Sequence, residues 1–140
     1  MTYLSRSEKY INIGLLVIRA GLGLLFIYHG YPKLTGGTQT WEHIGGAMGS
    51  VGIHFLPVFW GFAAAVTEAV GGLLIILGIL FRPACLLLLI NLAIAAIFTY
   101  KHSGSFGDAT HAIEDAIAFA GLFFTGPGLY SLSGRLKRNI

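Results

Sequence analysis

Four long apolar stretches dominate the chain, and short polar or glycine-rich connections separate them. They cover about residues 10–31, 56–81, 84–100 and 112–132, and each is 17–26 residues long. A helix needs about 20 apolar residues to cross a hydrocarbon core of about 30 Å. The pattern therefore predicts an all-α fold, an integral membrane four-helix bundle that forms one transmembrane domain over residues 1–140.

Each apolar stretch carries one narrow face of polar or small residues and one broad apolar face. The residues of each narrow face recur at spacings of three, four or seven, which places them on one side of a helix. The four faces are Asn12, Arg19, Phe26 and Lys33; Gly61, Ala64, Ala65, Glu68, Gly71 and Gly72; Asn91, Ala95, Thr99 and His102; and His111, Glu114, Ala118, Gly121 and Thr125. Because small residues in membrane helices usually face other helices, we expect these faces to form a polar core.

The connections contain their own signals. Residues 35–55 are rich in glycine, and the helical spacing of Trp41, Ile44 and Met48 favours a short interfacial helix, with an ordered loop as the alternative. Pro32 predicts that the first helix ends near residues 28–31. The Thr-Gly-Pro-Gly sequence at 125–128 predicts a kink or an end in the fourth helix.

Arg19 and Glu68 are the only charges within their apolar stretches. An ionisable group at membrane depth is costly and needs a partner or water. Both residues lie near the middle of neighbouring antiparallel helices, so we expect them to point inward and to pair with each other. A purely structural ion pair and a functional pair are both consistent with this pattern.

Composition and charge narrow the function classes. The chain is 55% hydrophobic and 11% charged, whereas soluble domains have about 25% charged residues. The net charge of +3 reflects membrane topology and does not indicate a nucleic-acid partner, because the Lys and Arg residues that flank the stretches divide six to two. One side has Arg6, Lys9, Arg82, Arg135, Lys137 and Arg138, and the other has Lys33 and Lys101. The positive-inside rule then predicts that both termini are cytoplasmic.

The single cysteine, Cys85, excludes an intramolecular disulfide, and we interpret it as a small buried hydrophobic residue.

A second polar group is expected at the outer end of the bundle. His111, Glu114 and Asp115 share a helix face there, and His29 and Lys33 lie at the same end of the first helix. Proton transfer, a His and carboxylate metal site, and solvated loops without a site are the three interpretations. No metal-ligand spacing appears, so we predict no metal. Acidic residues that complement a helix N-terminus explain the two carboxylates equally well.

Three motifs in order resemble the DoxX-like family of small four-span bacterial membrane proteins, over nearly the whole chain. They are the run from Arg19 through Gly30 to Lys33 and Leu34, the run from Glu68 through Gly71, Gly72 and Gly78 to Arg82, and Gly126-Pro127-Gly128 followed by Ser131 and Leu132. Leu129 and Ser133 stand where the family often has Arg and Asp. The resemblance implies a multi-pass protein of the bacterial inner membrane. One branch resembles the quinone-reducing membrane subunit of thiosulfate oxidation, and others resemble redox-stress complexes or assembly factors.

Three functions fit these features. The first is a quinone-associated subunit of a membrane oxidoreductase that receives electrons from a redox partner protein. Its polar core would comprise Arg19, Glu68, His111, Glu114 and Asp115, and its quinone pocket would comprise Arg19, Phe26, Tyr28, His29, Lys33 and Trp60. The second is a non-catalytic membrane scaffold or assembly factor, and the third, weaker one is a small-solute permease. The sequence leaves open whether the protein is an enzyme and whether it forms a homo-oligomer.

Overall fold

The computed structural model describes the backbone of residues 3–138 and the side chains of residues 6–136. The side chains of Lys137 and Arg138, which entered the predicted charge division, lie outside this range. The long helices are α1 (Tyr3–Thr35), α3 (Pro57–Leu77), α4 (Phe81–Ser103) and α5 (Phe106–Thr125), and the short ones are α2 (Thr38–Gly45), the 3-10 helix η1 (Gly46–Val51) and α6 (Leu132–Arg138). The predicted all-α membrane bundle is confirmed.

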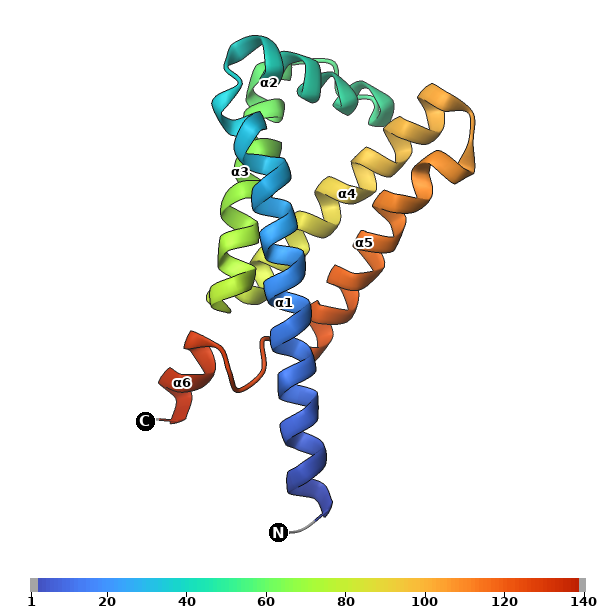
Figure 1. The fold of residues 1–140 in the computed structure, drawn as a ribbon. Helices are drawn as coiled ribbons and strands as arrows, with labels where there is room; N and C mark the ends of the chain where they lie inside the picture. The colour runs from blue at the N-terminus through green and yellow to red at the C-terminus, as the bar shows by residue number, and fades with distance from the viewer. Residues whose placement is uncertain (1–2, 139–140) are drawn as a thin grey trace.

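The long helices form two antiparallel pairs (Figure 1). Helix α1 packs along α3, and α4 packs along α5. The two pairs meet at the end where α3 turns into α4, and they diverge toward the other end, where α2 and η1 span the space between them (Figure 1). This divergence is the origin of the cavity described below.

Glycine lets α1 and α3 approach closely. A Cβ on Gly72 would lie 2.7 Å from the carbonyl oxygen of Gly23, and a Cβ on Gly30 would lie 2.8 Å from the Cβ of Glu68. The buried residues of α3 are Gly61, Ala65, Glu68, Gly71, Gly72 and Ile75. The prediction that the small-residue face of this helix points inward is therefore confirmed.

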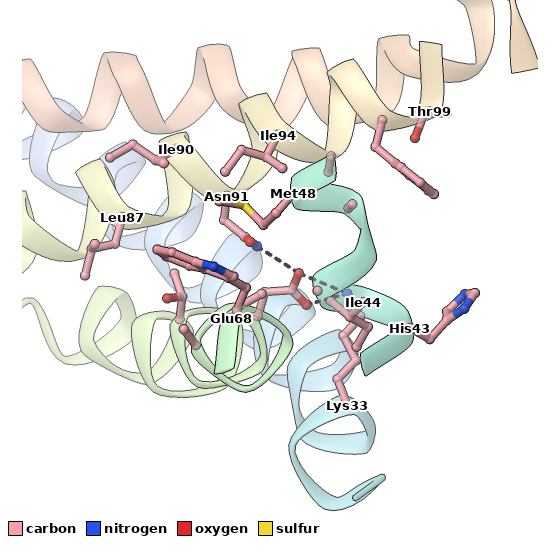
Figure 2. Close-up of a pocket in the computed structure, with 18 residues that line it drawn as sticks. Lys33, His43, Ile44, Met48, Glu68, Leu87, Ile90, Asn91, Ile94 and Thr99 are labelled. Atoms are coloured by element: carbon pink, nitrogen blue, oxygen red, sulfur yellow. Dashed lines mark hydrogen bonds and ion pairs between the residues drawn. The ribbon is translucent and has the colours of Figure 1, made fainter. Parts of the chain in front are cut away.

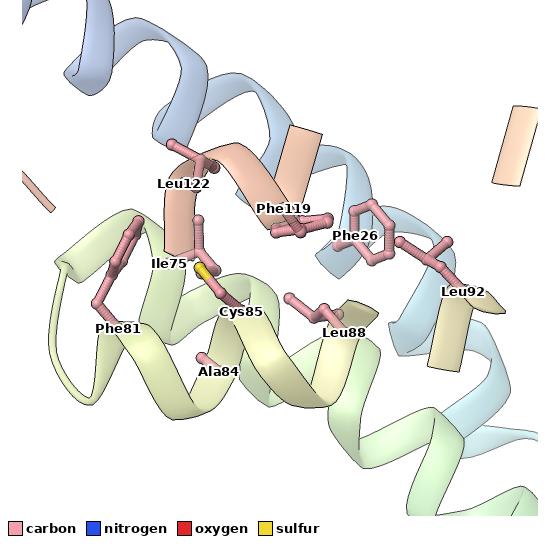
Figure 3. Packing of buried hydrophobic residues seen from close by; sticks show 9 residues of the cluster. All are labelled: Phe26, Ile75, Phe81, Ala84, Cys85, Leu88, Leu92, Phe119 and Leu122. Atoms are coloured by element: carbon pink, nitrogen blue, oxygen red, sulfur yellow. The ribbon is translucent and has the colours of Figure 1, made fainter. Parts of the chain in front are cut away.

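An apolar core fills the end where the two helix pairs meet (Figure 3). The ring of Phe26 packs edge-on against the ring of Phe119, with centroids 5.0 Å apart. Cys85 is fully buried in this cluster, as predicted. The other members are Ile75, Phe81, Ala84, Leu88, Leu92 and Leu122.

The prediction that Pro32 ends the first helix near residues 28–31 was wrong, because α1 continues to Thr35. Proline removes only one helical hydrogen bond this close to a helix end. The Thr35 hydroxyl also donates a hydrogen bond to the Tyr31 carbonyl at 3.0 Å, which supports the last turn. The extra turn carries Lys33 to the wall of the cavity described below.

The short helix predicted after the first span is confirmed as α2, and η1 continues it. The Trp41 indole nitrogen donates a hydrogen bond to the Lys33 carbonyl at 2.9 Å, and its ring packs against Phe62 of α3. Gly45 and Gly61 bring the backbones of α2 and α3 into contact. Helix α2 is thus fastened to both α1 and α3.

Helix α5 begins earlier and ends earlier than the predicted range of 112–132, and the expected end at the Thr-Gly-Pro-Gly sequence is confirmed at Thr125. The prediction that its polar and small face points into the bundle was wrong. His111, Glu114, Gly121 and Thr125 are exposed, and Ala109, Phe119 and Leu122 are buried instead. The large apolar side chains of α5 join the core shared with α1 and α4, which turns the small face outward.

Among the described residues, three helical stretches are long and apolar enough to cross a membrane. They are Arg6–Thr35, Pro57–Leu77 and Phe81–Ser103. Helix α5 has 20 residues but carries Asp108, Glu114 and Asp115. These three acidic residues, within a helix of only 20 residues, distinguish α5 from the three apolar stretches.

Candidate functional site

A cavity of about 430 Å³ lies between α3 and α4 and is covered by α2 and η1 (Figure 2). Its volume falls within the range of about 300–1,000 Å³ that is usual for small-molecule sites. The polar residues that line it are Lys33, His43, Trp60, Thr67, Glu68, Asn91 and Thr99. The rest of the lining is apolar or small: Ile44, Gly45, Ala47, Met48, Ala63, Ala64, Leu87, Ile90, Ile94, Ala95 and Phe98.

A three-residue polar network lies at the cavity wall (Figure 2). The Lys33 ammonium lies 2.9 Å from Glu68 Oε1 and 2.7 Å from Oε2, and the Asn91 amide nitrogen lies 3.0 Å from Oε1. The side chains of Lys33 and Glu68 are 37% and 11% exposed, respectively. The carboxylate is thus almost enclosed, and three charge-assisted hydrogen bonds hold it in place.

Three different helices supply this network. Glu68 projects from the small-residue face of α3, next to Gly30 of α1. Lys33 follows Gly30, which lies against Glu68 and Ala69 of α3, by three residues and therefore lies on the side of α1 that faces α3. Asn91 shares a face of α4 with Ala95 and Thr99, which also line the cavity. The network therefore depends on the packing of the whole bundle.

Arg19 lies at the opposite end of the bundle and is only 1% exposed. Its guanidinium donates hydrogen bonds to the carbonyl oxygens of Pro127, at 2.8 Å, and Tyr130, at 3.0 Å. Its Nε atom has no hydrogen-bond partner among the described residues. The group also borders Gly78, the cap that follows α3. The negative ends of the α3 and α5 dipoles and the loop carbonyls thus surround this cation.

The predicted Arg19–Glu68 ion pair was wrong, although both side chains are buried as expected. Glu68 pairs with Lys33, and the partners of Arg19 are backbone carbonyls. Arg19 and Lys33 are 14 residues apart, which is about 21 Å along a helix. Helix α1 is much longer than α3, so the middle of its apolar stretch lies opposite the end of α3 and not opposite Glu68.

The remaining predicted site residues are dispersed. Phe26 belongs to the apolar core, and Tyr28 and His29 are exposed on α1. On α5, His111 and Glu114 are exposed and Asp115 is half-buried. Of the predicted residues, the cavity brings together Lys33, Trp60 and Glu68. The proposed role of the α5 group in proton transfer stays a prediction.

Most of the cavity lining was not predicted as part of a site, and its polar members Asn91 and His43 are the two that matter most for chemistry. Asn91 stood out only as part of a polar face on the third stretch, and that face was the signal that could have identified it. His43 of α2 lines the cavity but lies in a segment where the sequence shows no chemical pattern. Within the described residues, no group of three or more His, Cys, Asp or Glu side chains could hold a metal ion.

Comparisons with known proteins place this chain in a family. The DoxX family model matches residues 14–101, which include Lys33, Glu68 and Asn91. The chain is 31% identical to the inner membrane protein YphA of Escherichia coli (strain K12), over 91% of this chain and 97% of that protein. It is 34% identical to a protein of Bacillus subtilis (strain 168) named "Putative oxidoreductase CatD", over 71% of this chain and 68% of that protein. No solved structure matches the chain. The chain therefore belongs to the DoxX family of integral membrane proteins.

Proposed function

We propose that the protein binds a quinone in the cavity between α3 and α4 and serves as the quinone-associated subunit of a membrane oxidoreductase. The observation that carries this proposal is the Lys33–Glu68–Asn91 network on the wall of a largely apolar cavity. A quinone needs a hydrogen-bond donor for its carbonyl oxygen and an apolar slot for its ring. A bundle whose interior was filled by side chains, without a cavity, would instead favour a non-catalytic membrane scaffold or assembly factor.

Lys33 replaces Arg19 as the group that binds the quinone carbonyl. Its ammonium has three N–H donors, and Glu68 accepts two of them. The third has no partner among the described residues, so it can donate to a ligand oxygen. Arg19 donates to Pro127 and Tyr130 and does not line the cavity. We assign it to holding the C-terminal loop.

Glu68 and Lys33 are the groups that exchange protons with the ligand. Reduction of a quinone to a quinol takes up two electrons and two protons, and the electrons come from a redox partner protein. Lys33 is partly exposed, so it can regain a proton from water. His43, which is exposed and lines the cavity, offers a second contact with water. The printed name of the Bacillus subtilis relative supports a redox role.

The proposed location is the bacterial inner membrane, as for the Escherichia coli relative. The proposed orientation has both termini in the cytoplasm, because most of the flanking Lys and Arg residues lie on the side of the termini. Lys33 then lies near the outer face. Reporter fusions at residue 140 and in the connection 35–55 test this orientation, and the same location for both reporters would refute it.

Quinone binding can be followed through Trp60, one of two tryptophans in the chain and part of the cavity lining. A quinone in the cavity should quench its fluorescence, and Trp60→Phe should remove most of that signal. Lys33→Met should weaken binding about tenfold or more, because a charge-assisted hydrogen bond is lost. Lys9→Met, an exposed lysine of the same helix, is the matched control. Equal quenching in Lys33→Met and the wild type would refute this assignment.

Proton-coupled turnover is a separate test of Glu68. Glu68→Gln keeps the size of the side chain and its hydrogen bonding but cannot titrate, so we expect quinone reduction with the partner protein to be lost while the fold is kept. Glu42→Gln, at an exposed position of α2, makes the same chemical change away from the cavity. Full turnover in Glu68→Gln would make Glu68 a structural residue and favour the scaffold.

A further inference from the structure

The cavity has an open flank toward the membrane. Leu87 and Ile90 line it, yet 54% and 48% of their surfaces are exposed. A residue can line a cavity and also be exposed on the outer surface only at a rim, where the cavity wall meets the surface of the bundle. In the wall opposite, α3 presents Ala63, Ala64 and Thr67, which leave space because they are small.

This rim lies near the middle of a membrane-crossing helix. Helix α4 spans Phe81–Ser103, and Leu87 and Ile90 lie in its second and third turns. Leu87 precedes Asn91 by four residues and Ile90 precedes it by one, so the rim begins beside the polar network and reaches about 6 Å along the helix from it. Below it, Ile75, Leu88 and the rest of the core close the bundle (Figure 3). The opening therefore faces acyl chains and not headgroups.

We infer that the ligand enters sideways from the bilayer between α3 and α4, and that its hydrocarbon tail leaves over Leu87 and Ile90. The head then reaches Lys33, Glu68 and Asn91 while the tail stays in lipid. This inference rests on the proposed function, because it takes a quinone as the ligand. It adds the substrate class, a quinone with a long tail, and the two residues that admit the tail.

The tail adds little affinity in this arrangement. Lipid chains are as apolar as the protein rim, so moving a tail from lipid to the rim gains no hydrophobic free energy. The polar head must supply the binding free energy, and the rim decides only whether a tailed ligand can place its head in the cavity. A bulky side chain at the rim should therefore weaken the binding of a quinone with a tail and leave the binding of a quinone without a tail nearly unchanged.

The test compares a benzoquinone without a tail and the same benzoquinone with a decyl chain, each titrated against the protein in lipid nanodiscs. Leu87→Trp and Ile90→Trp narrow the rim, and Leu86→Trp is the control at a neighbouring position that is 45% exposed but does not line the cavity. Quinone absorbance in the protein-bound fraction is the readout, since the new tryptophans complicate fluorescence.

We expect the two rim variants to bind the decyl quinone about tenfold more weakly than the wild type, because the bulky side chain obstructs the path of the tail; tenfold corresponds to about 1.4 kcal/mol. Binding of the tail-less quinone should change less than about twofold, which also shows that the cavity has folded. Unchanged decyl-quinone binding in both variants, or equal weakening of both ligands, would overturn the side entrance but leave the proposed function standing. Failure of the wild type to bind either quinone would overturn both.

Discussion

The two ends of the bundle each enclose a cation, and they do so in opposite ways. Lys33 faces a carboxylate, an amide and an open cavity, and it keeps contact with water. Arg19 is almost fully enclosed and donates to backbone carbonyls, with no carboxylate within ion-pair distance among the described side chains. An intramembrane charge is often read as a functional site. Here the surroundings, and not the charge itself, separate a candidate binding group from a structural one.

Each environment follows from what lies next to it in the fold. The Lys33 end is where the two helix pairs diverge, so space is left beside the ion pair (Figure 1). The Arg19 end is where α3 and α5 both end, which supplies carbonyl groups without further helical partners. Arg19 meets that need with rigid, planar donors. Lys33 is compact and can reorient toward a ligand.

The largest effect is expected from Arg19→Met. This change removes the donors of two part-buried hydrogen bonds to the carbonyls of Pro127 and Tyr130. An acceptor that loses its donor costs about 1–3 kcal/mol, and more the less water reaches it. The free energy of unfolding in detergent should therefore fall by about 2–6 kcal/mol. Arg6→Met, an exposed arginine on the same helix, should change it by less than about 0.5 kcal/mol. A similar small change for both variants would make Arg19 dispensable for stability and end the comparison.

The next effect isolates the crowding around Arg19. Gly78 and Gly104 both follow a long helix with φ near +70°, at 68° and 69°. A Cβ on Gly78 would collide with Arg19 Nη1 and Ser131 Cβ, whereas a Cβ on Gly104 meets nothing within 4 Å. Gly104→Ala should cost about 1 kcal/mol of unfolding free energy for the backbone alone.

Gly78→Ala should cost about 2–4 kcal/mol, because overpacking adds about 1–3 kcal/mol to the same backbone term. Chemical unfolding of both variants under identical detergent conditions measures the difference. If both variants lose the same unfolding free energy, the residues around Arg19 can move to make room for the added methyl group. The contacts of Arg19 would then hold the C-terminal loop less firmly than their distances imply.

The long helices of the fold are predictable from the sequence, because an apolar stretch of about 20 residues is typical of a membrane helix. The inward face of α3 also followed from its glycines and alanines, and this placed Glu68 inside. The partner of Glu68 did not follow, because the register of α1 against α3 is set by contacts such as Gly23 with Gly72. Sequence position within an apolar stretch is a poor measure of depth when one helix is far longer than its neighbour.

The spacing of residues along the helices could not predict the cavity or the orientation of α5. The cavity exists because α4 diverges from α3, which depends on the α2 and η1 segment between the helix pairs. On α5, spacing identified a polar and small face but not its direction. Phe119 and Leu122 decided that direction, since burying large apolar side chains in the core contributes more than burying alanine and glycine.

The smallest effect concerns the ion pair between Lys33 and Glu68. The test asks whether the two side chains stabilise each other or only lie close together. A double-mutant cycle with Lys33→Met and Glu68→Gln should give a coupling free energy of about 0.5–3 kcal/mol in unfolding experiments, the range for residues in direct contact. Lys33 is partly exposed, so solvent screening places the value toward the lower end. Glu68→Gln alone should cost less than Lys33→Met, because only the lysine variant leaves an enclosed carboxylate without its cation. A coupling near zero would show that the ion pair does not stabilise the fold. The two ends of the bundle would then differ more sharply, with stability resting on Arg19 and the Lys33 network free to serve a ligand.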